Sequence, residues 1–141
     1  MYSRRLGMAS RYVWLINQDI EPQLYGLSLD VGTGGLPLYM PPGGLSDAPY
    51  GRLMGLPVIA NEHSATLGTV GDIVLADLSQ YLLIDKGGTQ FDQSIHVNFT
   101  YDETVFRFVY RVDGQPVDAA PVTPANSTAT QSPFIALASR E

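Results

Sequence analysis

Two apolar segments, one near each end of the chain, most constrain what it can fold into. Residues 12–16 read Tyr-Val-Trp-Leu-Ile and residues 133–138 read Pro-Phe-Ile-Ala-Leu-Ala, with no charged side chain in either. A short run that is apolar at every position is typical of a strand covered on both faces. Because a terminal strand frays unless it docks onto earlier structure, we expect the last segment to pair with a strand earlier in the chain.

The composition fits one folded domain and excludes several classes of function. With 141 residues, 45% of them hydrophobic and 16% charged, the chain can bury a core and carries too little charge to be disordered. Its net charge of −6 disfavours nucleic-acid binding, because phosphate recognition needs clustered cations. The absence of cysteine excludes disulfides, thiolate metal sites and thiol catalysis. The chain has neither an apolar run of membrane-spanning length nor an apolar signal core after Arg4 and Arg5, so we expect a soluble, cytoplasmic protein without a membrane partner.

The second half of the chain is expected to be mostly strands. The apolar runs at 71–77 and 81–85 predict two strands joined by a turn or a half-turn of helix. Residues 94–101 and 104–112 alternate polar and apolar side chains, on either side of a turn at 102–103. A period of two predicts half-buried antiparallel strands that form a hairpin.

The first half is expected to hold one short helix and an irregular excursion. Asp19 can cap a helix, Pro22 suits its first turn, and Ile20, Leu24 and Leu27 recur at helical spacing. The segment from residue 32 to 55 is rich in glycine and proline, which predicts irregular backbone with an isolated strand at 38–40. Extended structure resumes at 52–59, where Pro57 indicates an edge strand or a bend. The whole pattern predicts an α+β fold with a mixed central sheet.

Four local signatures, in order along the chain, carry a family resemblance. They are a strand ending in Asn at 12–17, the segment Leu-Met-Gly-Leu-Pro-Val at 53–58, a strand followed by Ser-Gln-Tyr at 71–81, and a strand ending Tyr-Arg-Val-Asp-Gly at 110–114. Together they resemble the C-terminal half of the major capsid proteins of tailed bacteriophages and prophages, which have the Hong Kong ninety-seven type fold.

That resemblance implies a structural protein that is not an enzyme and has no cofactor. It implies a subunit of a phage or prophage icosahedral shell, located in the virion capsid and made in the host bacterial cytoplasm, that acts by self-association. Its partners would be other copies of itself, together with scaffolding or portal proteins, and no specific nucleic acid. Family members are longer and begin with an arm, an extended loop and a spine helix. The resemblance therefore also implies a truncated or fragmentary subunit with an apolar patch left uncovered.

The resemblance further implies a layout for residues 1–141 as a single partial subunit. Residues from about 10 to 90, with 133–139, would form an axial-domain-like core of mixed sheet and one or two short helices, which meets its neighbours at the capsomer centre. The terminal strand at 134–138 would return to this sheet, beside residues 12–16. Residues from about 94 to 113 would form a protruding, peripheral-domain-like antiparallel β-hairpin.

The side chains that can carry chemistry do not form a convincing catalytic or metal site in the sequence. The glycines at 32–35 and 42–44 lack the Lys-Ser/Thr that follows them in phosphate-binding loops. His63, beside Glu62, and His96 are too few and too far apart for a metal site, so we interpret both as solvated. Four aspartates lie near strand ends, where carboxylates commonly cap turns: Asp72, Asp77, Asp85 and Asp92. We therefore predict no catalytic, cofactor-binding or metal-binding residue.

Arg107 and Arg111 are the candidate subunit-contact residues. The alternation of the strand at 104–112 places both on one face, where they could pair with acidic side chains across the hairpin. The other interpretation is a salt bridge to an adjacent subunit. An alternative to the capsid function is a small β-rich ligand-binding module or enzyme that uses the 32–55 loop region. A deep pocket lined by His63, Glu62 and the strand-end aspartates would favour that alternative.

Overall fold

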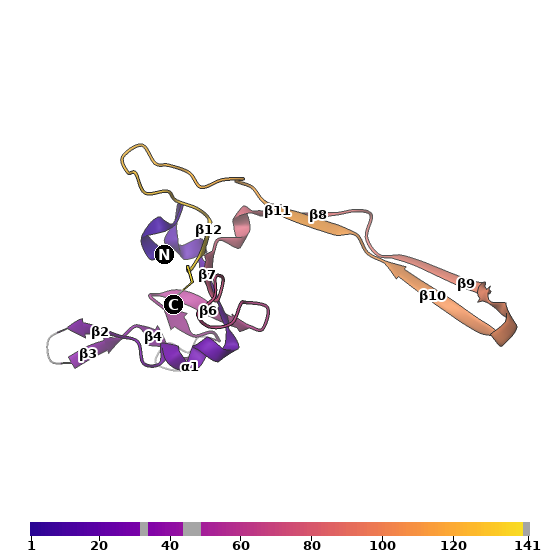
Figure 1. Cartoon of the computed structure of the whole chain (residues 1–141), viewed down its shortest axis with the longest axis horizontal. Helices are drawn as coiled ribbons and strands as arrows, with labels where there is room; N and C mark the ends of the chain where they lie inside the picture. The colour runs from indigo at the N-terminus through magenta and orange to yellow at the C-terminus, as the bar shows by residue number, and fades with distance from the viewer. Residues whose placement is uncertain (32–33, 44–48, 140–141) are drawn as a thin grey trace. The chain divides into compact units, whose positions relative to one another are not determined.

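The computed structural model describes residues 1–31, 34–43 and 49–139 (Figure 1). Most of its regular structure is β-strand, and the single α-helix, α1 (Glu21–Leu24), is short. No helix within these described ranges is long and apolar enough to cross a membrane. The remaining helical turns are 3-10: η1 (Tyr2–Arg4), η2 (Ala9–Arg11), η3 (Gln18–Ile20), η4 (Leu78–Gln80) and η5 (Phe99–Tyr101).

The chain divides into two compact units. The first comprises Met1–Gln80 and Asp118–Glu141, and we call it the core unit. The second comprises Tyr81–Val117, and we call it the ribbon.

A six-stranded mixed sheet organises the core unit. Its strand order is β12-β7-β1-β6-β5-β4. β1 and β6 run parallel, whereas every other neighbouring pair in this sheet is antiparallel. A mixed sheet with few short helices agrees with the predicted fold class. The strands are β1 (Val13–Asn17), β4 (Tyr39–Met40), β5 (Arg52–Leu53), β6 (Leu56–Asn61), β7 (Ile73–Ala76) and β12 (Phe134–Ala136).

The two apolar end segments do join one sheet, as predicted, but they are not neighbours. β7 lies between them, with Leu75 paired to Trp14 on one side and to Ile135 on the other. The pairing of β12 is extended by hydrogen bonds from Asp77 N to Pro133 O, 2.8 Å, and from Leu137 N to Ile73 O, 3.0 Å. The prediction of direct contact was wrong because an apolar run specifies that a strand is buried, not which strand lies beside it.

The core of this unit lies on the central strands. Trp14 and Ile16 of β1 and Leu75 of β7 are buried, and they pack with buried side chains from β4, β5, β6 and α1. The Trp14 indole also donates a hydrogen bond to Leu53 O, 3.1 Å, so its polar atom is satisfied within the core. The first apolar segment therefore positions the rest of the sheet.

Tyr12 connects the N-terminal segment to the strand at the other end of the chain. Its buried hydroxyl accepts a hydrogen bond from Leu6 N, 2.8 Å, and its proton lies within reach of Leu6 O, 2.8 Å, and Ser132 O, 3.2 Å. Burial raises the pKa of Tyr12 above its ordinary value. A neighbouring bridge pairs Arg5 with Ser132.

The predicted helix after β1 is shorter than expected and begins earlier. Ile20 and Leu24 are buried as the spacing predicted, but α1 ends at Leu24, and Leu27 is 42% exposed. The helical segment begins with η3, and the cap of η3 is Asn17, whose side-chain oxygen accepts from Asp19 N, 3.0 Å. α1 itself has no side-chain cap. Asp19 was the wrong cap because Asn17, the last residue of β1, already starts the turn with its own side chain.

The glycine- and proline-rich segment is more regular than expected where the structure describes it. β2 (Ser28–Val31) and β3 (Gly34–Pro37) form a separate two-stranded hairpin (Figure 1). β4 is not isolated, because it pairs with β5. Residues 32–33 and 44–48, which belong to the same prediction, lie outside the described residues.

Pro57 does not mark an edge strand. β6 lies between β1 and β5, and the bend comes just before it, in a two-residue turn where Met54 and Gly55 both have positive φ angles, 52° and 82°. Proline is tolerated here because the register with β1 starts one residue later, at Val58.

The ribbon contains two antiparallel strand pairs. They are β8 (Tyr81–Asp85) with β11 (Val112–Pro116), and β9 (Gln90–Asn98) with β10 (Glu103–Val109). The predicted hairpin is confirmed by the second pair, which turns at Asp102 with a φ of 54°. The prediction that its strands are half-buried by an apolar face was wrong, since no residue of the ribbon is buried. Alternation fixes which side chains share a face, whereas burial needs a second layer.

Candidate interaction surface

One side of the β9–β10 hairpin is apolar, and we call it the apolar face. The register pairs Phe108 with Phe91 and Phe106 with Gln93, which places these side chains on the same side. The Phe91 ring stacks on Phe106 at 5.9 Å between centroids and contacts Phe108 at 5.1 Å. Side chains alternate between the two sides of a strand, so Ile95 and Val97 of β9 lie on the same side as Phe91. The apolar face comprises Phe91, Ile95, Val97, Phe106 and Phe108.

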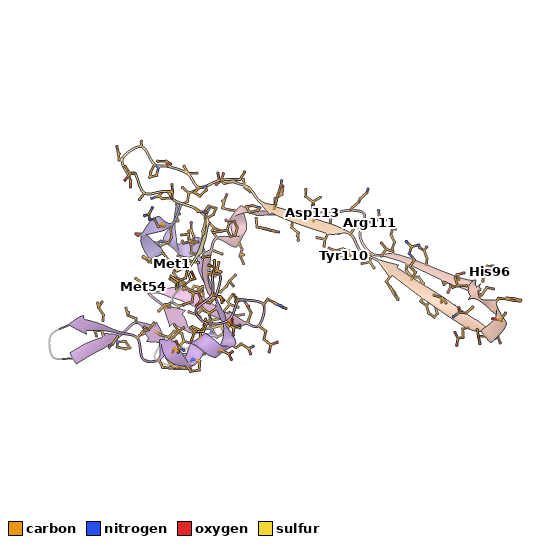
Figure 2. All side chains as sticks on the ribbon, in the orientation of Figure 1. Met1, Met54, His96, Tyr110, Arg111 and Asp113 are labelled. Carbon is orange, nitrogen blue, oxygen red and sulfur yellow. The ribbon has the colours of Figure 1, made fainter. Side chains whose placement is uncertain are left out.

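The apolar face is open to solvent. Its least exposed member, Phe91, is 55% exposed and Phe108 is 70% exposed. The side chains of the ribbon stand out from two strands rather than from a layered sheet (Figure 2). Two-stranded ribbons are marginally stable at best in water, and contiguous exposed apolar surface marks an interaction site. The apolar patch expected from the family resemblance is therefore present, and it lies on the ribbon.

The opposite side of the hairpin is polar and carries Arg107. The register places Arg107 directly opposite Asp92, as cross-strand pairing would require. Both side chains are exposed, and within the described residues no ion pair joins them. Their proximity is therefore compatible with a weak contact inside the hairpin or with a partner from outside.

Arg111 lies beyond the end of β10, so it does not share the strand of Arg107. Figure 2 shows it between Tyr110 and Asp113, in the connection to β11. Its carbonyl accepts a hydrogen bond from Lys86 N, 3.0 Å. The side chains of Lys86 and Arg111 line two small adjoining cavities of about 40 and 280 Å³. Two cations thus flank the point where the strand pairs of the ribbon meet.

The histidines do not form a site with other ligands. His63 and Glu62 are exposed in the loop after β6, and His96 is exposed in β9 near the end of the hairpin (Figure 2). The part of the chain that the structure describes has no group of three His, Asp or Glu side chains that could hold a metal ion.

Three of the four strand-end aspartates cap turns, as expected. Asp72, fully buried, accepts from Gly68 N, 3.0 Å, and Ile73 N, 2.7 Å. Asp77 accepts from the amide and the hydroxyl of Ser79, 3.0 and 2.6 Å. Asp85 accepts from Gly88 N, 3.3 Å. Asp92 lies within β9 instead.

A groove in the core unit was not foreseen from the sequence. It has a volume of about 550 Å³, and we call it the α1 groove. It draws on the helix region and on the loop before β7, segments about 40 residues apart, so no local pattern could have revealed it. Its lining contains neither His63 nor Glu62 nor any residue of 32–55, so it does not provide the pocket that the alternative function needs. Lining residues are Ile20, Gln23, Leu24, Leu27, Leu67, Gly68 and Ile73.

Tyr39 is a second feature that sequence reasoning missed. Its buried hydroxyl donates to Glu21 Oε1, 3.0 Å, and its ring meets Tyr25 edge to face at 5.3 Å. Burial, reinforced by the hydrogen bond and charge of Glu21, raises the pKa of Tyr39 to about 12. The contact fixes β4 to the start of α1.

Comparison with known proteins gives two matches of different kinds. The model of the phage capsid family matches residues 2–127. Among solved structures, the chain is similar to one described as the capsid of an empty GTA particle computed with C5 symmetry, with a TM-score of 0.56 and 19% identity. That alignment covers 80% of this chain and 37% of the other, and at this identity it shows a likeness of fold. No curated protein matches the chain significantly.

Proposed function

This chain belongs to the phage capsid family, and on that premise we propose that it is a structural subunit of a phage or prophage icosahedral shell that acts by self-association. The observation that carries the proposal is the ribbon, in which the apolar face is exposed and no residue is buried. A closed shell needs complementary surfaces that are repeated on every copy, and an apolar face without a core of its own suits that need.

We propose the Hong Kong ninety-seven type layout for the chain. In it, residues from about 10 to 90 with 133–139 form the axial-domain-like core, and residues from about 94 to 113 form the peripheral-domain-like hairpin. The division of the chain into the core unit and the ribbon supports two parts with different roles, although the ribbon starts earlier than this layout, at Tyr81.

Arg107 and Arg111 are proposed to bind carboxylates of an adjacent copy. Both are exposed, and a guanidinium binds a carboxylate with two parallel hydrogen bonds. The chain itself supplies the partners, since it has 14 acidic against 8 basic side chains. Further proposed partners are scaffolding or portal proteins.

This function involves no turnover and no cofactor, and it places the protein in the virion capsid after synthesis in the host bacterial cytoplasm. The proposal is supported by the family match and by exposed apolar and cationic surface rather than by a reactive site.

Sedimentation velocity over a concentration series tests the proposal. The expected result is weak oligomers whose average mass rises with concentration. Replacing Phe106 and Phe108 with serine should weaken association at least tenfold, because it removes much of the apolar face. The matched control replaces two exposed apolar side chains of the core unit, Met8 and Val122, with serine and should leave association unchanged. A wild-type chain that stays monomeric at every concentration would contradict the proposal.

A further inference from the structure

The β2–β3 hairpin carries an unpartnered pair of leucines. Leu29 and Leu36 lie directly opposite each other in the register, so both side chains are on the same face. They are 53% and 60% exposed. Among the described strands, β2 and β3 pair only with each other. A two-stranded hairpin of this kind gains stability when its apolar face is covered.

The α1 groove offers a complementary surface on the same unit. Ile20 and Leu24, 2% and 3% exposed, form its floor. Leu27 and Leu67, 42% and 46% exposed, form its sides. Ile20 and Leu24 are thus already shielded from water, whereas Leu27 and Leu67 lose their remaining contact with water when an apolar side chain enters the groove.

The hairpin does not fill the groove of its own copy. The chain leaves the groove at Leu27 and enters β2 at the next residue, and Leu38 N donates to Leu27 O, 3.0 Å, at the base of the hairpin. Figure 1 shows β2 and β3 extending away from α1. The groove keeps its volume of about 550 Å³ with the hairpin in place.

The charge of the chain favours another copy as the occupant. The chain has a net charge of −6, so two copies repel each other on average. Neither the lining of the groove nor the Leu29–Leu36 pair contains a charged side chain. These are two surfaces at which two copies can meet without that repulsion, and every copy carries both.

We propose that the Leu29–Leu36 pair of one copy inserts into the α1 groove of a second copy. The inference rests on the proposed self-association and specifies its contact in the core unit. The two surfaces are different, so the contact is head-to-tail, and each copy has one hairpin and one groove free for further neighbours. Such a contact generates rings where the rotation between copies closes and filaments where it does not.

Disulfide trapping tests the contact cleanly because the natural chain has no cysteine. One full-length variant carries Leu36→Cys, the other carries Leu67→Cys, and the two are mixed in equal amounts under mild oxidation. The expected result is a covalent dimer of one copy of each, formed at least tenfold faster than in a control mixture of Leu36→Cys with Val122→Cys. Val122 is similarly exposed, 41%, and does not line the groove.

A chain that carries Leu36→Cys and Leu67→Cys together gives a second readout. The head-to-tail contact predicts a ladder of covalent oligomers. A closed monomer with an internal disulfide would overturn the inference, because the hairpin would then reach its own groove. Equal trapping in the test and control mixtures would also overturn it. Sedimentation of the wild-type chain separates the two proposals: association without selective trapping rejects the contact alone, and absence of association rejects both.

Discussion

The core unit and the ribbon are both rich in apolar strands, yet they use them in opposite ways. In the core unit, Trp14, Ile16 and Leu75 are buried because six strands, α1 and the loops enclose them. In the ribbon, Leu83 and Phe108 are 65% and 70% exposed because each strand has one partner and no covering layer. The difference shows that apolar sequence alone does not make a core. Apolar strands present a surface that other residues have to cover, and those residues come either from the same chain or from another chain.

The largest effect is expected from a substitution that creates a cavity in the core unit. Leu75→Ala should reduce the free energy of unfolding by about 2–5 kcal/mol, because Leu75 is fully buried between β1 and β12. Urea unfolding followed by Trp14 fluorescence measures this, since Trp14 pairs with Leu75. A loss below about 1 kcal/mol would show that the sheet is not the stabilising element of the chain.

High pH should weaken the core unit through Tyr39. Its pKa of about 12 in the folded chain exceeds the ordinary value of 10, so folding favours the neutral phenol. That contribution is complete below pH 10 and is lost as the pH rises towards 12. We expect a loss of about 1–3 kcal/mol in urea unfolding between these limits.

Tyr39→Phe is the matched control, because it keeps the buried ring and removes the titrating group. Its unfolding free energy should vary less between pH 10 and 12 than that of the wild type. An identical pH dependence in both proteins would show that Tyr39 is not the group responsible.

A smaller effect is expected from the hydroxyl of Tyr12. Tyr12→Phe should cost about 1 kcal/mol, because the substitution removes the hydrogen bonds to Leu6 and Ser132. Hydrogen exchange should show faster exchange at the amide of Leu6, which donates to the Tyr12 hydroxyl, with the amides of β1 little changed. Equal acceleration across β1 would mean that the substitution loosens the whole sheet.

The smallest effect is expected in the ribbon. Leu83→Ala should change the unfolding free energy of the dilute, unassociated chain by less than about 0.5 kcal/mol, because the side chain is mostly exposed. The same urea experiment as for Leu75 measures it. A loss of unfolding free energy comparable to that of Leu75→Ala would show that the ribbon depends on apolar packing as much as the core unit does.

The sequence predicted the elements of the fold better than their neighbours. Runs such as Ile73–Ala76 identified strands because burial on both faces requires apolar residues at every position. The position of β7 between β1 and β12 could not be predicted, since strand order depends on long-range packing. The cap at Asn17 was missed for a local reason: an asparagine that ends a strand can also begin the next turn.

For the interaction surface, the sequence predicted which residues share a face but not what covers them. The alternation correctly grouped Phe106 with Phe108 and placed Arg107 on the other side, while the end of β10 at Val109 separated Arg111 from that strand. The α1 groove was out of reach, because Leu27 and Leu67 come together only when the loop before β7 folds against the helix region.

The position of β12 has a consequence for biosynthesis. This strand leaves the ribosome after β7 and after the whole ribbon, so the sheet acquires its outer strand only once the ribbon has been synthesised. Until then β7 is an unprotected edge, the kind of strand that pairs with other nascent polypeptides. A chain that stops before Phe134 therefore leaves the edge of β7 open to pairing with other chains, whereas a chain that includes β12 covers that edge.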